Sequence, residues 1–168
     1  MSDDIPEQYL IRGIRRTRPL PTYSPELAGP ALALARHLDA WLPTQHEAAF
    51  EVLSDGWFQL RSFPPSLIRL PLAVVRGKLP TLETDWVPSL PEVAVDVFVG
   101  KDRYGDLCDR VDECLACGAS LVWILEPGFR TVTVYRPDAE PVLFNRTQTL
   151  SADPVLPGFS CPVADLFR

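Results

Sequence analysis

The sequence has no apolar stretch long enough to cross a membrane, because proline, arginine or aspartate interrupts every hydrophobic run. A membrane-spanning helix needs about 20 consecutive apolar residues. The opening MSDDIPEQYL also lacks the basic and apolar segments of a signal peptide. We therefore expect a cytoplasmic protein with no membrane partner. With 168 residues, of which 46% are hydrophobic and 23% charged, the chain has the size and composition of one folded domain.

Basic residues are few, with 16 Lys and Arg against 22 Asp and Glu and a net charge of −6. Non-specific binding to nucleic acid needs clustered basic side chains, so this balance disfavours it. One local cluster remains, formed by Arg12, Arg15, Arg16 and Arg18. It is either a solvated segment or a contact for a phosphate group or a protein partner.

Cysteine is scarce as well, with four residues in the chain. In a protein expected in the cytoplasm, a disulfide framework is disfavoured. The C-L-A-C of Cys114 and Cys117 lacks the second Cys or His pair that a zinc site needs. Packed or surface thiols are therefore favoured over a redox or zinc protein, which would carry bound metal when purified.

Eighteen prolines divide the chain into segments. We expect residues 1–24 to form an irregular arm and residues 25–168 to form a single domain. Ser24-Pro25-Glu26 is typical of a helix start, and apolar residues at helical spacing follow it. The period then changes to two. Strands are predicted at 47–53 and 57–61, joined as a hairpin by a turn at 54–56 that contains glycine, and a third strand at 70–76.

The second half alternates strand and helix. Residues 91–99 predict the most apolar strand, 106–117 a helix, 120–126 a second buried strand and 131–135 an exposed final strand. Hydrophobic residues in the tail LPGFSCPVADLF predict that it packs back onto the domain. A strand–helix–strand crossover joined to a hairpin-rich first half indicates an α/β domain with a mixed sheet. The exposed strand 131–135 could pair across an axis in a homodimer.

One residue conflicts with the most apolar strand. Alternation places Asp96 on the same face as Ala94 and Phe98, in the middle of the strand. A buried unpaired charge costs several kcal/mol, so Asp96 needs an arginine, backbone donors or a metal ion as partner. It is either a paired structural aspartate or a functional carboxylate aimed into a cleft at the end of the strand.

Several stretches, taken in order, resemble the Uma-type restriction-endonuclease family, a branch of the PD-(D/E)xK nuclease superfamily. The resemblance covers nearly the whole chain and is strongest from residue 91 onward. It implies a restriction-endonuclease-like mixed β-sheet flanked by helices, and Mg²⁺-dependent cleavage of DNA. The stretches that carry it are PEVAVDV (91–97), LCDRVDECLACG (107–118), LVWILEPGFRTVTVYRP (121–137) and LPGFSCPVADLF (156–167), with weaker similarity in IRLPLAVVR (68–76) and YLIRGI (9–14).

This sequence departs from the family at the positions that the resemblance assigns to chemistry. Leu72 corresponds to the first metal-binding aspartate, and leucine cannot ligate a metal. Asp96 keeps the second acid, whereas Arg110 replaces a catalytic lysine and cannot release a proton near neutral pH. Val99 stands in place of a serine, and Cys114 in place of a helix tyrosine. Together these replacements indicate a decayed site, in which an Asp96–Arg110 ion pair is expected.

Whether the protein is an enzyme therefore stays open. If it is active, the resemblance implies a metal-dependent DNA endonuclease in which Asp96 binds Mg²⁺ and Arg110 steadies the scissile phosphate. An unidentified acid would then replace Leu72. The alternative is a catalytically inactive binding or interaction module. Such a module would contact a protein partner or nucleic acid, with the Arg12–Arg18 cluster as its candidate surface.

Overall fold

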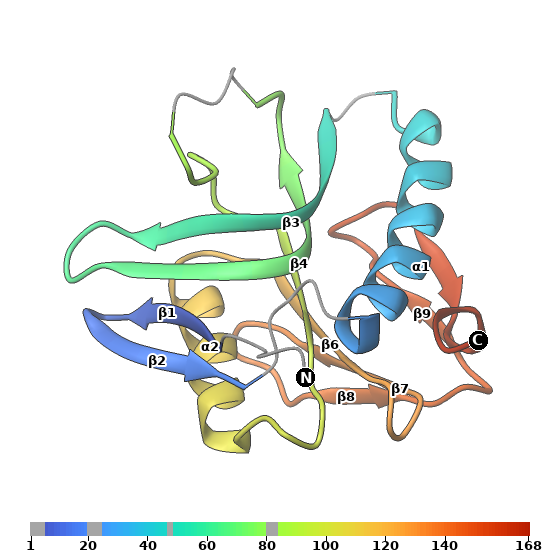
Figure 1. Ribbon diagram of the computed structural model, residues 1–168. Helices are drawn as coiled ribbons and strands as arrows, with labels where there is room; N and C mark the ends of the chain where they lie inside the picture. The colour runs from blue at the N-terminus through green and yellow to red at the C-terminus, as the bar shows by residue number, and fades with distance from the viewer. Residues whose placement is uncertain (1–5, 20–24, 47–48, 80–83) are drawn as a thin grey trace.

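The computed structural model describes residues 6–19, 25–46, 49–79 and 84–168 (Figure 1). Within them lie an eight-stranded mixed sheet of order β2-β1-β4-β5-β6-β7-β8, in which β3 pairs with β4, and a two-stranded sheet of β9 and β10. The strands are β1 (Glu7–Ile11), β2 (Ile14–Arg18), β3 (Phe50–Arg61), β4 (Ser66–Arg76), β5 (Val93–Val97), β6 (Leu121–Glu126), β7 (Thr131–Tyr135), β8 (Val142–Phe144), β9 (Thr149–Ser151) and β10 (Ser160–Pro162). The helices are α1 (Pro25–Trp41), η1 (Leu42–Thr44), α2 (Tyr104–Ala116) and η2 (Val163–Leu166). None of the described helices is long and apolar enough to cross a membrane.

The expectation of an irregular N-terminal arm is wrong for residues 7–18, which form the β1–β2 hairpin. Arg12 and Gly13 both adopt positive φ, 49° and 79°, and so close a tight two-residue turn. Leu10 pairs with Leu67, which joins the hairpin to β4. The three arginines of β2 hid this strand from the sequence pattern, although two of them, Arg16 and Arg18, are paired with acids of the fold. The rest of the expected arm, residues 1–5 and 20–24, lies outside the described part of the chain.

The expected hairpin turn at 54–56 is also wrong, because β3 continues through it. Asp55 does adopt a positive φ of 56°, but the chain keeps its antiparallel pairing with β4 on both sides. The register places Asp55 opposite Pro71, which has no N–H to donate to the ladder. Asp55 instead binds the Arg69 guanidinium at 2.6 and 2.7 Å. Residues 54–56 are therefore an irregular point within β3. The chain reverses direction at 62–65, between β3 and β4.

The second half follows the predicted order. Strand β5 runs parallel to β6 through the crossover helix α2, and β6, β7 and β8 continue as antiparallel neighbours. Gly118, with φ of 116°, follows the end of α2. The final strand is not exposed, however, because β8 covers the edge of β7 and Thr131–Val134 are buried. A homodimer formed by pairing of β7 is therefore not available in this fold.

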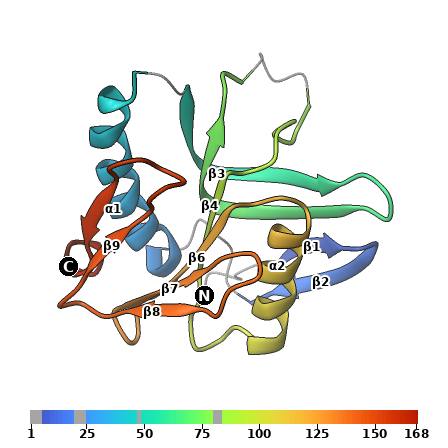
Figure 2. The same ribbon diagram turned by 180° about the vertical axis from the view of Figure 1, so that it is seen from behind.

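The sheet separates two hydrophobic cores, one beneath α1 and one beneath α2 (Figures 1 and 2). Val93 and Val95 face the core of α1, whereas Ala94 faces the core of α2, as the pleat of β5 requires. The C-terminal tail packs into the α1 core, as predicted. Its residues Leu156, Phe159, Val163 and Leu166 are buried there, and Phe159 stacks on Trp123 at 5.7 Å between ring centroids.

Candidate functional site

Asp96 lies on the α2 side of β5 and accepts hydrogen bonds through both of its carboxylate oxygens. Arg110 Nε donates to Oδ2 at 2.8 Å, which confirms the expected ion pair. Arg18 Nη2 and the backbone N–H of Val97 both donate to Oδ1, at 2.7 and 2.8 Å. Asp96, Arg110 and Arg18 are only 2%, 3% and 1% exposed. Asp96, the carboxylate that the sequence placed in the most apolar strand without a partner, is therefore a buried aspartate held between two arginines.

Arg110 reaches Asp96 from the inward face of α2, where Leu107, Val111 and Cys114 are also buried. Its Nη1 donates to the Tyr9 hydroxyl at 3.2 Å, and its guanidinium carbon lies 5.4 Å from the centre of the Tyr9 ring. Burial lowers the pKa of Arg110, but the charge of Asp96 and the contact with Tyr9 outweigh this effect. The pKa of Arg110 is therefore raised above its ordinary value. Arg110 is therefore a permanent cation.

Arg18, at the end of β2, is the partner of Asp96 that the sequence did not predict, although it was noted as one of the basic residues 12–18. Its Nη2 donates to the backbone carbonyl of Val97 at 2.6 Å in addition to Asp96. The same nitrogen lies 3.7 Å from Asp102 Oδ2. The sequence did contain a hint of this partner, because a buried aspartate requires a cation and basic residues are few in this chain. Only the hairpin geometry shows which arginine of residues 12–18 points inward.

Asp102 supplies the second acid of this cluster from the loop between β5 and α2. Its side chain is 2% exposed, and its Oδ2 lies 3.9 Å from Arg110 Nη2 as well as close to Arg18. Burial raises the pKa of Asp102, and the two arginines oppose this effect. With both acids ionised, two carboxylates face two guanidinium groups and the formal charge of the cluster is balanced.

Leu72 does not belong to this cluster. It pairs with Val95 across β4 and β5, so the two side chains share one face of the sheet. That face is covered by α1, and Leu72 is fully buried in the α1 core. Asp96, the residue after Val95, points to the opposite face. A carboxylate at position 72 would therefore enter the α1 core instead of meeting Asp96.

The residues of this cluster do not fit a bound Mg²⁺ ion in their present arrangement. Burial alone would raise the pKa of Asp96, but Arg18 and Arg110 outweigh it and lower the pKa to about 2. Asp96 is therefore ionised, yet guanidinium groups already occupy both of its oxygens. Mg²⁺ demands near-octahedral oxygen ligands and usually keeps several waters. Among the described residues, no group of three or more His, Cys, Asp and Glu could hold a metal ion.

Two other arginines of the N-terminal cluster, Arg12 and Arg16, form ion pairs with α2 at the surface of the fold. Arg12 Nε donates to Glu113 at 2.8 Å, and Arg16 pairs with Asp106 at 3.3 Å and Asp109 at 3.0 Å. These three acids all lie on α2. The cluster therefore mainly clamps the hairpin onto α2. The expectation of a solvated segment is therefore wrong for Arg18, which is 1% exposed. A partner contact by the other arginines stays a prediction.

Glu113 is a second buried junction on α2. Its oxygens accept hydrogen bonds from Arg61 Nε at 2.9 Å and the Ser66 hydroxyl at 2.7 Å, besides Arg12. Burial would raise the pKa of Glu113, but the hydrogen bonds from Arg61, Ser66 and Arg12 lower it to about 2. This carboxylate therefore ties the β1–β2 hairpin and the β3–β4 ribbon to one helix.

The environment of the two cysteines of C-L-A-C disfavours a reactive thiol at either of them. All four are free, and Cys114 and Cys161 are buried. Burial raises the pKa of the Cys114 thiol and of the partly buried Cys117 thiol, which lies 3.5 Å from Glu113. A raised pKa keeps a thiol protonated and poorly nucleophilic.

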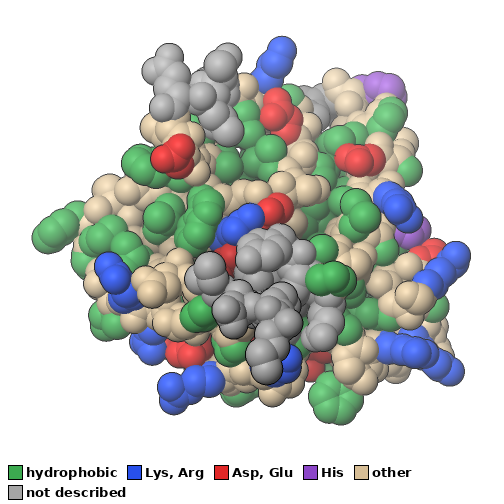
Figure 3. All heavy atoms as spheres, viewed as in Figure 1, with side chains coloured by type: hydrophobic (Ala, Val, Ile, Leu, Met, Phe, Trp, Pro, Cys, Tyr) green, Lys and Arg blue, Asp and Glu red, His purple; other side chains and the backbone are tan. Residues whose placement is uncertain are grey.

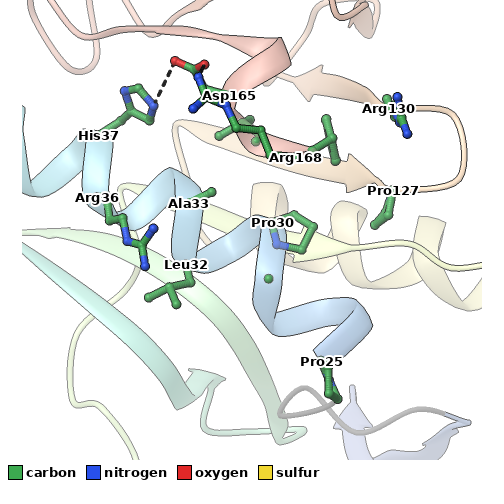
Figure 4. A pocket seen from close by; sticks show the side chains of 13 residues that line it. Pro25, Pro30, Leu32, Ala33, Arg36, His37, Pro127, Arg130, Asp165 and Arg168 are labelled. Carbon is green, nitrogen blue, oxygen red and sulfur yellow. Dashed lines mark hydrogen bonds and ion pairs between the residues drawn. The ribbon is translucent and has the colours of Figure 1, made fainter.

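A cavity of about 660 Å³ lies away from Asp96, between α1, the β6–β7 turn and the C-terminal segment (Figure 4). Figure 4 shows His37 pointing at Asp165, at 3.5 Å, and Arg168 forms a second ion pair with the same carboxylate. None of the residues that line the cavity belongs to the aspartate–arginine cluster.

The family of the chain can be assigned from its sequence pattern. The sequence pattern of the Uma2 family, which is described as "Putative restriction endonuclease", matches residues 19–164 of this chain. The chain belongs to the Uma2 family. The match begins one residue after Arg18, so it includes Asp96, Asp102 and Arg110 but not the hairpin that completes the cluster.

A solved structure supports the fold of this Uma2 chain. It is the crystal structure of a putative nuclease belonging to DUF820 from Anabaena variabilis ATCC 29413. The two chains are 17% identical, with a TM-score of 0.78 over 96% of this chain and 90% of the other. A search of curated proteins found no match. The restriction-endonuclease-like fold is thus confirmed. The family match supports a nuclease-like protein.

Proposed function

We propose that this Uma2 protein is a restriction-endonuclease-like protein with little or no phosphodiester cleavage, because internal arginines neutralise the acids of its site. The observation that carries the proposal is the double occupancy of Asp96, with Arg18 on one oxygen and Arg110 on the other. Asp96 would be the metal-binding acid of an active relative. Here it serves as the anion of a buried ion-pair cluster.

The chemistry of metal-dependent cleavage supports this interpretation. A divalent ion lowers the pKa of a bound water and stabilises charge on the phosphate, so it must reach both carboxylate ligands and the substrate. The Asp96 and Asp102 side chains are 3% and 2% exposed, which leaves no surface for a phosphodiester to approach. Arg110, which stands in place of the family lysine, is a permanent cation that cannot exchange a proton with water.

The alternative function is an inactive module that binds a partner, and the charge distribution favours a protein over duplex DNA. Three arginines of the N-terminal cluster are already paired with acids of the same chain. On the face that Figure 3 shows, basic side chains are scattered and mixed with acidic ones. With a net charge of −6, a continuous phosphate-binding track is not supported.

Plasmid cleavage tests the proposal. The wild-type chain, at several concentrations with Mg²⁺ or Mn²⁺, is compared with Asp96→Asn, which keeps the size of the side chain but removes its charge. We expect no metal-dependent nicking by the wild type above the level of the variant. Nicking by the wild type that Asp96→Asn abolishes, while circular dichroism shows both proteins folded, would overturn the proposal.

Duplex binding separates the alternatives. Fluorescence anisotropy of a labelled duplex is measured at increasing salt for the wild type and for Arg15→Gln, which removes the arginine of the cluster whose side chain lies outside these ion pairs. We expect weak binding that this variant does not change. A steep loss of affinity with salt, together with a tenfold or greater loss in the variant, would establish a nucleic-acid surface at this cluster.

A further inference from the structure

We propose that the cavity beside α1 is a docking groove for an acidic, extended peptide segment of a partner protein. This α1 groove is the cavity of about 660 Å³ between α1, the β6–β7 turn and the C-terminal segment. It lies on the α1 side of the sheet, whereas Asp96 points to the α2 side and pairs with Arg110 there. The proposal therefore does not depend on whether Asp96 supports catalysis.

Unpaired positive charge gathers at the α1 groove. Among the described residues, Arg36 and Arg130 line the groove and have no ion pair or hydrogen bond to their guanidinium groups. The single acidic side chain in the described lining, Asp165, is bound by Arg168 and lies 3.5 Å from His37. Two arginines are thus left uncompensated in a chain whose net charge is −6. This local excess of guanidinium groups favours an occupant that carries carboxylates.

Apolar side chains separate these arginines. Figure 4 shows Arg36 on α1 and Arg130 on the β6–β7 turn at opposite ends of the lining, with Pro30 and Ala33 between them. Leu32 also lines the groove and is 54% exposed. A phosphate chain, which binds through its charge, gains little from these surfaces, whereas a peptide with alternating acidic and apolar side chains covers both. The lining therefore favours a polypeptide.

The dimensions of the groove fit a short extended segment. Its lining on α1 runs from Pro25 to His37, which corresponds to about 18 Å of helix. An extended chain advances about 3.4 Å per residue, so about five residues span this distance. A second cavity of about 180 Å³ shares Arg130 and Phe167 with the groove and adds Arg146. Two adjoining cavities suit an elongated occupant better than a compact small molecule.

Gly29 leaves room for the close approach of a peptide backbone. It lies within α1 and lines the groove, and a Cβ at this position would meet no atom within 4 Å. Glycine inside a helix is less favourable than alanine, and no contact of the described residues requires it here. An occupant of the groove accounts for a glycine that the free protein does not need.

A pooled library of labelled hexapeptides tests the proposal with the full-length chain. Acidic residues occupy alternate positions of each peptide, and the positions between them vary among apolar residues. A matched library has Asn and Gln in place of Asp and Glu. We expect the wild type to select acidic peptides and none of their amide counterparts, and fluorescence anisotropy then measures the Kd of the selected peptides. If no acidic peptide is enriched over its amide counterpart, the proposal is wrong.

Three variants locate the bound peptide. Arg36→Gln combined with Arg130→Gln should weaken binding by about tenfold or more, because it removes the unpaired charges of the groove. The matched control, Arg15→Gln combined with Arg103→Gln, removes two exposed arginines elsewhere and should change the Kd by less than about twofold. Gly29→Ala should weaken binding while the Tm stays equal or rises, because its methyl group narrows the groove but favours the helix. Equal losses in the two double variants would assign binding to non-specific attraction and overturn the proposal.

Competition with DNA distinguishes a peptide from a phosphate chain. We expect an unlabelled duplex not to displace the selected peptides. A duplex that displaces them, and that itself loses affinity when Arg36 and Arg130 are replaced by glutamine, would assign the groove to nucleic acid and overturn the proposal. Metal-dependent plasmid cleavage by the wild type overturns the proposed function alone, because Asp96 is not part of the groove.

Discussion

Asp96 illustrates how much the position of a single residue in the sequence can disclose. A carboxylate in the most apolar strand needs a buried partner, and a following amphipathic helix brings Arg110 within reach, so this ion pair could be predicted. Arg18 could not, because it reaches Asp96 across 78 residues through a hairpin whose charged strand has no apolar pattern. Pairing between distant strands depends on tertiary packing that local periodicity does not report.

At this scale, Asp96→Asn should lower the free energy of unfolding by roughly 3–5 kcal/mol, since it leaves the buried guanidinium groups with too little negative charge. Urea denaturation monitored by circular dichroism measures the change. The matched control is Asp112→Asn, the same substitution at an exposed position on α2, which should change stability by less than about 0.5 kcal/mol. Equal effects of the two substitutions would show that the ion pairs do not support the fold.

At the scale of elements, periodicity predicted β4 to β7 and α2, because each has a clear apolar face or an apolar run. Prediction from periodicity failed where the local composition is typical of a different structure from the one that forms. Ser54-Asp55-Gly56 has the composition of a hairpin turn, yet the chain there stays paired with β4. The family resemblance also assigned Leu72 to the site. The register of β4 against β5 instead places Leu72 on the face of the sheet opposite to Asp96.

The register of β4 leads to a prediction for Leu72→Asp. This variant restores the acid that the family resemblance expects, but it places a charge in the α1 core without a partner. We expect a loss of several kcal/mol in stability and no metal binding. Thermal denaturation with and without Mn²⁺ measures both effects, and Leu72→Ala, which costs about 2–5 kcal/mol through the cavity alone, is the control. A Tm that rises with Mn²⁺ in Leu72→Asp would contradict the assignment of faces.

At the scale of the whole molecule, α2 is a common anchor for segments that are far apart in the chain. Glu113 of α2 holds Arg12 of the β1–β2 turn and Arg61 of β3. Arg110 of α2 and Arg18 of β2 both hold Asp96, and both carboxylates keep their charge in the folded state. Their pKa values of about 2 lie below those of the unfolded chain, which are near 4. The stability that these groups contribute is therefore fully present above about pH 5 and is lost as the pH falls toward 2.

We accordingly expect acid to weaken the fold, with Asp96 and Glu113 each accounting for roughly 2–3 kcal/mol between pH 5 and pH 2. Asp102 acts in the opposite direction, because its pKa is raised in the folded state. Urea denaturation at pH 7, 5, 4 and 3 measures the slope. In Glu113→Gln the slope should be smaller by the share of that carboxylate, and an unchanged slope would contradict the role of Glu113.

The division of the interior into two cores also has an optical consequence. Of the four tryptophans, Trp41 and Trp123 lie in the α1 core, while Trp57 packs against the α2 core. Indole emission moves to longer wavelength when water reaches the ring. Fluorescence from a chain that keeps only Trp41 and Trp123 would therefore report on the α1 core alone, and one that keeps only Trp57 would report on the other. Each side of the sheet thus has its own tryptophan fluorophore. Loosening of the arginine cluster, which lies on the α2 side, can therefore be followed without an added label.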